Sequence, residues 1–209
     1  MSEINLYNMD CMEAMKEMED NKYDLGIVDI PYGLGEKLTN GGTWASKYKT
    51  QDSKWDILPP EKYFKELFRV SKNQIIWGGN YAHNFLKSNR HFIIWDKISH
   101  MPTMADCEYA WSSLDCNAKI FKHPRNTAIK RIHITQKPIK LYKWLLYNYA
   151  KEGDKILDTH GGSMSIAIAC HDMGFDLELY ELDKDYFQAG KERLERHQRQ
   201  QQFSFGGER

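Results

Sequence analysis

The segment Asp29-Ile30-Pro31-Tyr32 combines groups that could activate an exocyclic amine on an aromatic ring. The lone pair of such an amine is delocalised into the ring, so its nitrogen is a poor nucleophile. The Asp29 carboxylate and the Ile30 carbonyl could accept its two N–H groups and leave the lone pair free. Pro31 biases Ile30 towards an extended backbone, and Tyr32 offers a face for stacking. The same residues also fit an ordinary turn that ends a strand, and alone they do not decide between the two.

A second segment, from Asp158 to Glu181, predicts the order strand, glycine loop, helix, strand and acid. It lacks the GxxxxGK[ST] and GxGxxG patterns of other nucleotide loops. Glu181 follows the loop at the distance, about 20 residues, where a carboxylate binds the two hydroxyls of a ribose. Gly161 and Gly162 allow close backbone approach, and Ser163 could cap a helix whose first N–H groups suit a carboxylate. A ligand with a ribose, an amino group for Asp158 and a carboxylate is S-adenosylmethionine. The alternative is a tight turn with a capping serine and a solvated glutamate.

Residues 161–165 also differ by one position from the G-x-S-x-G nucleophile elbow of hydrolases. Such an enzyme places its acid and its histidine after the nucleophile, and only a short stretch follows Ser163. The histidines there are His171, inside a predicted helix, and His197, in the tail. Neither histidine is placed to act on Ser163, so the sequence does not support a hydrolase.

These residues need an α/β domain to position them. Asp29 and Asp158 each end a predicted strand, and parallel sheets bind ligands beyond the carboxyl ends of their strands. The pattern predicts strands over residues 4–7, 24–29, 74–77, 92–95, 154–158 and 175–180, with further strands near 108–111 and 119–121. It predicts helices over 10–19, 60–70, 80–86, 138–150, 163–173 and 184–196.

Taken together, these segments resemble the amino-methylating DNA methyltransferases, in the permuted order in which the catalytic motif precedes the cofactor motif. The family's Asp-Pro-Pro-Tyr matches residues 29–32 and departs at Ile30. Its Asp-Pro-Phe-x-Gly-Ser-Gly-Thr matches residues 158–165, where Met164 replaces the final glycine. The Gly-Asp-Cys segment matches residues 9–11, and His-x-x-x-Lys-Pro matches 133–138. The intervening strands look like residues 75–81 and 93–96.

The resemblance implies roles for these positions. Catalysis falls to Asp29, Ile30, Pro31 and Tyr32. Asp10 borders the adenine of the cofactor, Glu181 its ribose and Lys137 its methionine end. The full set implied for S-adenosyl-L-methionine is Asp10, Cys11, His133, Gln136, Lys137, Pro138, Asp158, Thr159, His160, Gly161, Gly162, Ser163 and Glu181.

The resemblance further implies a fold, a reaction and competing readings. The fold is a Rossmann-like, S-adenosylmethionine-dependent methyltransferase fold, with a mostly parallel sheet, helices on both faces and a small inserted target-recognition region. The reaction is methylation of N6 of a flipped adenine, since N4-cytosine members more often carry serine at the position of Asp29. The short, divergent chain looks like the stand-alone enzymes of phages and prophages. The alternatives are N4-cytosine methylation, methylation of an RNA base or a protein amide, and a catalytically silent DNA-binding module, for which Met164 argues.

Charge distribution suggests where DNA binds. The chain has 29 basic and 29 acidic residues and a formal net charge of zero, but residues 59–150 are basic while both ends are acidic. Clustered basic side chains bind phosphates whatever the net charge; a solvated face is the alternative. The family places DNA-contacting elements at 33–58 and 97–136. The candidates there are Trp44, Lys47, Lys49, Trp111, Lys119, Lys122, Arg125, Lys130 and Arg131.

Composition sets the remaining expectations. We expect one methyltransferase domain over residues 1–196 and a disordered tail over 197–209. The 4 cysteines are scattered with no CxxC pair, which favours a cytoplasmic protein without a metal site. No apolar run reaches the length of a membrane helix. The expected partner is double-stranded DNA, and a homodimer and a restriction endonuclease partner are both compatible with this reading.

Overall fold

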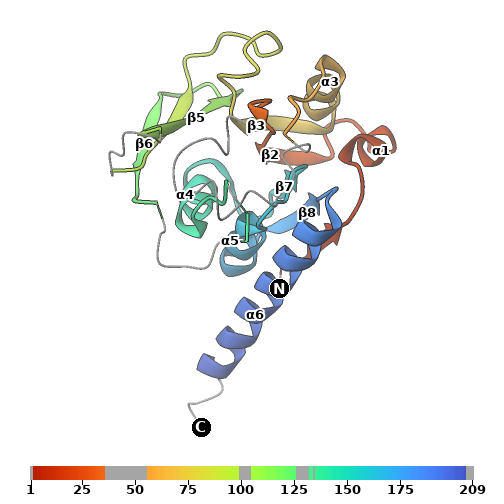
Figure 1. The fold of residues 1–209 in the computed structure, drawn as a ribbon, viewed down its shortest axis with the longest axis vertical. Helices are drawn as coiled ribbons and strands as arrows, with labels where there is room; N and C mark the ends of the chain where they lie inside the picture. Colours follow the sequence, from red (N-terminus) through yellow and green to blue (C-terminus); the bar gives the residue numbers. More distant parts are fainter. Residues whose placement is uncertain (1, 36–55, 99–104, 126–131, 134, 206–209) are drawn as a thin grey trace.

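One eight-stranded sheet carries the predicted motifs in the computed structural model, which describes residues 2–35, 56–98, 105–125, 132–133 and 135–205 (Figure 1). The strand order is β1-β8-β7-β2-β3-β5-β4-β6. β5 runs antiparallel to its neighbours β3 and β4, and the other pairings are parallel. The strands are β1 (Ile4–Tyr7), β2 (Tyr23–Asp29), β3 (Ser71–Trp77), β4 (Phe92–Asp96), β5 (Cys107–Ser112), β6 (Lys119–Lys122), β7 (Lys155–Asp158) and β8 (Asp176–Tyr180).

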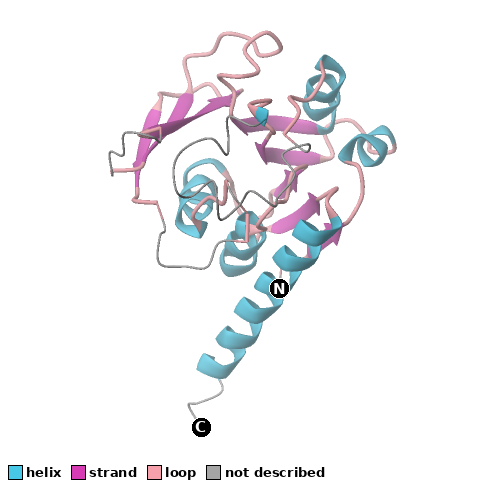
Figure 2. Ribbon diagram, in the orientation of Figure 1, coloured by secondary structure: helices cyan, strands magenta, loops and turns pink. Residues whose placement is uncertain are grey.

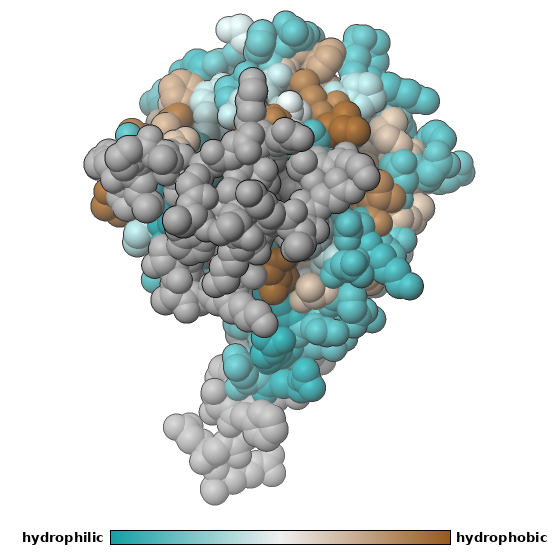
Figure 3. Space-filling model, viewed as in Figure 1, coloured by the Kyte–Doolittle hydropathy of each residue, from teal (hydrophilic) through white to brown (hydrophobic). Residues whose placement is uncertain are grey.

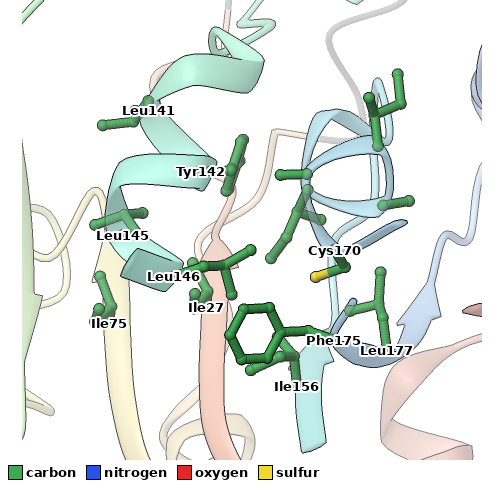
Figure 4. Close-up of a cluster of buried hydrophobic side chains, with 14 of the residues drawn as sticks. Ile27, Ile75, Leu141, Tyr142, Leu145, Leu146, Ile156, Cys170, Phe175 and Leu177 are labelled. Atoms are coloured by element: carbon green, nitrogen blue, oxygen red, sulfur yellow. The ribbon is translucent and has the colours of Figure 1, made fainter. Parts of the chain in front are cut away.

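Helices cover both faces of this sheet (Figure 2). Helices α4 (Ile139–Tyr149) and α5 (Ser165–Met173) pack on one face, and α1 (Cys11–Lys16) and α3 (Glu61–Val70) on the other. Successive residues of a strand point to opposite faces, so Ile27 contacts the layer of α4 and α5 (Figure 4) while Val28 faces α1 and α3. The central strands are therefore apolar throughout, as expected of a sheet covered on both sides.

Three local predictions were wrong. Residues 80–86 form turns, because their backbone N–H groups bond three residues back, as from Phe85 to Ala82. Ser163 does not cap α5; the N-cap residue is Met164. The chain from His197 does not fray at once but continues α6 (Lys184–Phe205), which packs against α5 through its first half and then projects from the body (Figure 1).

The extension of α6 has an identifiable support. Leu194 is buried, and the His197 ring lies 2.7 Å from a carboxylate oxygen of Asp172 on α5. Beyond the body, the described surface of α6 is hydrophilic (Figure 3). In the part of the chain that the structure describes, no helix has the length and apolar character needed to cross a bilayer, and no three metal-binding side chains cluster.

Candidate active site

The catalytic and cofactor segments meet at one edge of the sheet. β2 and β7 are parallel neighbours, with Leu25 paired to Ile156, so Asp29 and Asp158 end adjacent strands on the same side. A cavity of about 580 Å³ opens there. Its wall includes Asp10, Cys11, Asp29, Ile30, Pro31, Tyr32, His133, Gln136, Lys137, Thr159, His160, Gly161, Gly162, Ser163 and Glu181. The structure thus brings together nearly all of the predicted catalytic and cofactor residues, although they come from distant parts of the chain.

Two predicted cofactor residues lie outside this lining. Pro138 is the N-cap residue of α4. The Asp158 side chain is buried under the loop, where one of its oxygens accepts the His160 N–H at 3.0 Å. Burial raises the pKa of Asp158 to about 8, and the nearby carboxylates of Asp29 and Glu181 add to the rise.

The Glu181 carboxylate is fixed at the wall of the cavity by two backbone groups. The Gly162 N–H donates to one oxygen at 2.6 Å and the Asp183 N–H to the other at 2.8 Å. Each carboxylate oxygen has a second lone pair, so a ligand with two adjacent hydroxyls can still donate to Glu181. The neighbouring wall is apolar at Met9 and Leu182. This set fits a ribose with an attached base.

Asp29, also on the wall of the cavity, is held by two partners. Its Oδ2 lies 2.5 Å from the Lys137 Nζ, and its Oδ1 accepts the Tyr32 hydroxyl at 3.0 Å. The Tyr32 ring stacks on Tyr81 with 4.8 Å between centroids. Gly78 approaches this ring so closely that a Cβ at that position would lie 2.2 Å from Cε1 of Tyr32. Since Tyr81 covers one face of Tyr32, a base can stack only on the other.

Two histidines at the cavity are neutral at physiological pH. Burial lowers the pKa of His133 to about 4, and the Lys137 ammonium contributes. Its ring lies 4.3 Å from that of Tyr186, and its Nδ1 faces the Thr135 hydroxyl at 3.0 Å. Burial likewise lowers the pKa of His160 to about 4. Neither ring therefore brings a positive charge to a cationic ligand.

Sequence reasoning missed three acidic or basic residues near Asp29. Glu108 of β5 pairs with Lys97 at 2.7 Å and with Lys137 at 3.1 Å. Asp56 is buried, and its carboxylate accepts four backbone N–H groups, from Tyr32, Gly33, Leu34 and Gly35. The sequence shows each of them as a single charged residue, which does not specify a partner.

The predicted DNA-contacting residues that the structure describes differ in their surroundings. Trp111 is buried, and its indole donates to the Lys87 carbonyl at 2.8 Å. Lys119 and Lys122 are exposed on β6 and Arg125 donates to the Ala105 carbonyl, whereas Lys137 of the same basic run is buried beside Asp29. The predictions for Trp44, Lys47, Lys49, Lys130 and Arg131 lie outside the described residues.

Comparison with known proteins identifies the family. A sequence profile described as DNA methylase, covering the N6 and N4 enzymes, matches residues 80–192, slightly more than half of the chain. The protein belongs to this DNA methylase family. The matched region contains Lys137, the glycine loop and Glu181, whereas the Asp29 segment precedes it. The Type II methyltransferase M.HpaI of Haemophilus parainfluenzae is 23% identical over 228 residues, which cover 88% of this methylase and 72% of the relative.

Solved structures confirm the predicted fold of this DNA methylase. A complex of M1.HpyAVI with S-adenosylmethionine has a TM-score of 0.60 and 21% identity, covering 91% of this chain and 99% of that one. The cytosine-N4-specific PvuII DNA methyltransferase has a TM-score of 0.66 and 11% identity, covering 94% and 91%. The protein therefore has the α/β fold of S-adenosylmethionine-dependent DNA methyltransferases, with a mostly parallel sheet between helical layers.

Proposed function

We propose that this DNA methylase uses S-adenosyl-L-methionine to methylate N6 of an adenine extruded from double-stranded DNA. One observation carries the proposal: the Asp29 carboxylate and the Glu181 carboxylate lie on the wall of the same cavity. M1.HpyAVI and a DNA modification methylase from Thermus thermophilus, both of the same fold, have been solved with S-adenosylmethionine. When bound, this cofactor supplies a methyl group on a sulfonium, a good leaving group.

Residues of this chain fit the cofactor. Glu181 would accept the ribose hydroxyls, and Asp10 and Cys11, which line the same cavity, would border the adenine. The buried Asp158 would act from beneath the loop, through the His160 backbone that it anchors. Met164, where the family has glycine, keeps a left-handed backbone with φ of 53°. The loop therefore retains the shape that the family's glycine permits.

Other residues would bind and orient the target base. Extrusion from the duplex costs a few kcal/mol, and stacking against the free face of Tyr32 would offset about 1–3 kcal/mol of it. The Asp29 carboxylate and the Ile30 carbonyl would accept the two amine N–H groups. The nitrogen lone pair is then directed away from the ring plane and can attack a methyl group. Asp29 at the head of this motif supports adenine over cytosine.

The test is to identify the modified nucleoside. Duplex DNA treated with the protein and S-adenosylmethionine should yield N6-methyladenine after digestion to nucleosides. Asp29→Asn should lower the rate by at least about 100-fold, because an amide cannot accept through both of its polar atoms, while cofactor binding measured by calorimetry persists. N4-methylcytosine as the product would replace adenine by cytosine as the target. Failure to bind the cofactor even with DNA present would favour a silent DNA-binding module.

A further inference from the structure

Four charged side chains of alternating sign form a row that begins at the proposed catalytic acid, and the two lysines among them are buried while the two acids are partly buried. The Lys137 side chain has no solvent-exposed surface, and its Nζ lies 2.5 Å from Asp29 Oδ2 and 3.1 Å from Glu108 Oε2. The other Glu108 oxygen lies 2.7 Å from the Lys97 Nζ, and that lysine side chain is 7% exposed. Two acids and two bases thus balance one another in the order Asp29, Lys137, Glu108 and Lys97.

The sheet topology explains how distant residues meet there. Asp29 ends β2, and Lys97 directly follows β4. β5 runs the opposite way, so its first residues lie beside the ends of the parallel strands, and Glu108 pairs with Trp95 of β4. Lys137 precedes α4 and reaches the same edge. Because β5 runs antiparallel to its neighbours, an acid near the start of β5 lies at the edge where β2 and β4 end.

Such a row of charges is not explained by stability alone. Buried ion pairs often add little to the free energy of unfolding, because desolvation offsets their attraction. An isolated buried ammonium or carboxylate is far more costly. The arrangement therefore lets each group stay charged at low cost. Asp29 and Lys137 line the cavity, whereas Glu108 and Lys97 do not, so Asp29 is the acid of this set that a ligand can reach.

We propose that Lys137 and Glu108 are positioning residues that keep the Asp29 carboxylate ionised and oriented to accept the amine of the target base. The role rests on the proposed function, although the charged state of Asp29 can be measured without it. Lys137 occupies one lone pair of Oδ2 and Tyr32 one of Oδ1. The remaining lone pairs of a fixed, ionised carboxylate can accept an amine N–H. A protonated carboxyl would donate instead.

The groups facing Asp29 pull its pKa in opposite directions. Burial is the largest influence and leaves the pKa of Asp29 raised overall. The Lys137 ammonium limits this rise, Glu108 adds to it, and the Tyr32 hydroxyl lowers the pKa by donating a hydrogen bond. Asp158 on the adjacent strand lies near enough for the two carboxylates to repel each other, and Tyr142 of α4 lies near the pair. Lys137 is thus the main group that opposes the effect of burial on the Asp29 pKa, and Glu108 weakens the effect of Lys137.

The test is a titration of Asp29 in the ligand-free protein. With ¹³C-carboxyl-labelled aspartate, the Asp29 signal is assigned by its loss in Asp29→Asn, and its midpoint is followed by NMR. Lys137→Met should raise this midpoint by about 1–3 pH units, the usual effect of a nearby opposite charge. Glu108→Gln should lower it, since it removes a repelling charge and frees Lys137 to act on Asp29 alone. Arg90→Gln breaks an ion pair between largely exposed side chains, Arg90 and Asp115, and should leave the midpoint unchanged.

The proposal predicts that the Asp29 midpoint shifts up in Lys137→Met and down in Glu108→Gln. A merely structural role of the two residues would not produce shifts in opposite directions. The acid limb of the pH–rate profile for methyl transfer should move in the same two directions. If Lys137→Met does not fold, Glu108→Gln decides alone: an unchanged or raised midpoint overturns the proposal. Expected midpoints together with no methylated DNA from the wild-type protein would instead reject the proposed function and leave the counter-ion role standing.

Discussion

At the scale of single residues, Asp158 differs from Asp29 in its weaker link to the Lys137 ammonium, which forms its ion pair with Asp29. Burial is the main cause of the raised pKa of Asp158, and the carboxylates of Asp29 and Glu181 add to it. The hydrogen bond from the His160 N–H and the more distant Lys137 ammonium lower the pKa only in part. A carboxyl whose pKa is raised on folding binds its proton more tightly in the native state. Its contribution to stability therefore falls as pH rises.

We expect the free energy of unfolding to depend less on pH in Asp158→Asn than in the wild type. The native carboxyl holds its proton up to about pH 8, whereas the unfolded one releases it near its ordinary value of 3.8. Between these values the wild type should lose more than about 1 kcal/mol relative to the variant, because Asn keeps the acceptor for the His160 N–H but does not ionise. Urea unfolding from pH 4 to 8 measures the difference between the two curves.

Asp115→Asn is the matched control, since that side chain is 87% exposed. Its curve should run parallel to that of the wild type. The prediction for Asp158 fails if the gap between wild type and Asp158→Asn stays constant with pH. The pH dependence of the wild type alone does not isolate Asp158, because two histidines act in the opposite direction. His133 and His160 are neutral in the native state, so they make the free energy of unfolding rise with pH up to their ordinary titration range. The difference between the wild-type and variant curves removes this contribution.

At the scale of elements, the glycine loop and α6 depend on each other. Met164 holds a left-handed backbone that non-glycine residues rarely adopt, and its side chain is fully buried. A Cβ built on Gly190 of α6 would lie 2.6 Å from Met164 Cγ and 3.0 Å from its Sδ. The methionine that replaces the family's glycine thus fills space that a glycine in another helix leaves open.

This predicts an energetic coupling between the two positions. Gly190→Ala should destabilise the protein by about 1–3 kcal/mol, the usual cost of overpacking a core. Adding Met164→Ala removes the clashing atoms, so the double variant should lose less than the sum of the single variants, with a coupling of at least about 0.5 kcal/mol. Chemical unfolding of the four proteins gives this cycle, and additive losses would contradict it.

The elements also show what the sequence could predict. Strands β2, β7 and β8 and helix α3 follow from apolar runs and their periodicity, because packing there agrees with local pattern. The motif residues Asp29 and Glu181 follow from their places at strand ends. Glu108 and Lys97 could not be predicted, because their function comes from partners that only an antiparallel β5 brings near. Ser163 was expected to cap α5 by type, yet its hydroxyl faces Ser165 at 3.1 Å.

At the scale of the whole molecule, zero net charge has to be reconciled with a polyanionic partner. Binding to DNA depends on local clusters, since each neutralised phosphate releases condensed counter-ions. Lys122 ends β6, and β6 is parallel to β4, so it lies at the same edge of the sheet as the candidate site. Lys119 begins the same strand, and its Nζ lies 2.6 Å from Asn148 Oδ1.

We therefore expect Lys119→Ala with Lys122→Ala to flatten the salt dependence of DNA binding. The slope of log affinity against log salt should fall by up to about 0.9 for each phosphate that is no longer neutralised. Fluorescence anisotropy of a labelled duplex over a range of KCl concentrations measures it. Lys65→Ala with Lys72→Ala removes the same charge, but these lysines pair with Glu61 and Asp24, and Lys72 lies near the start of β3, away from the site edge. The control variant should bind DNA nearly as tightly as the wild type and should show the same slope of log affinity against log salt. Equal slopes for all three proteins would mean that β6 is a solvated edge and that any phosphate binding comes from other segments.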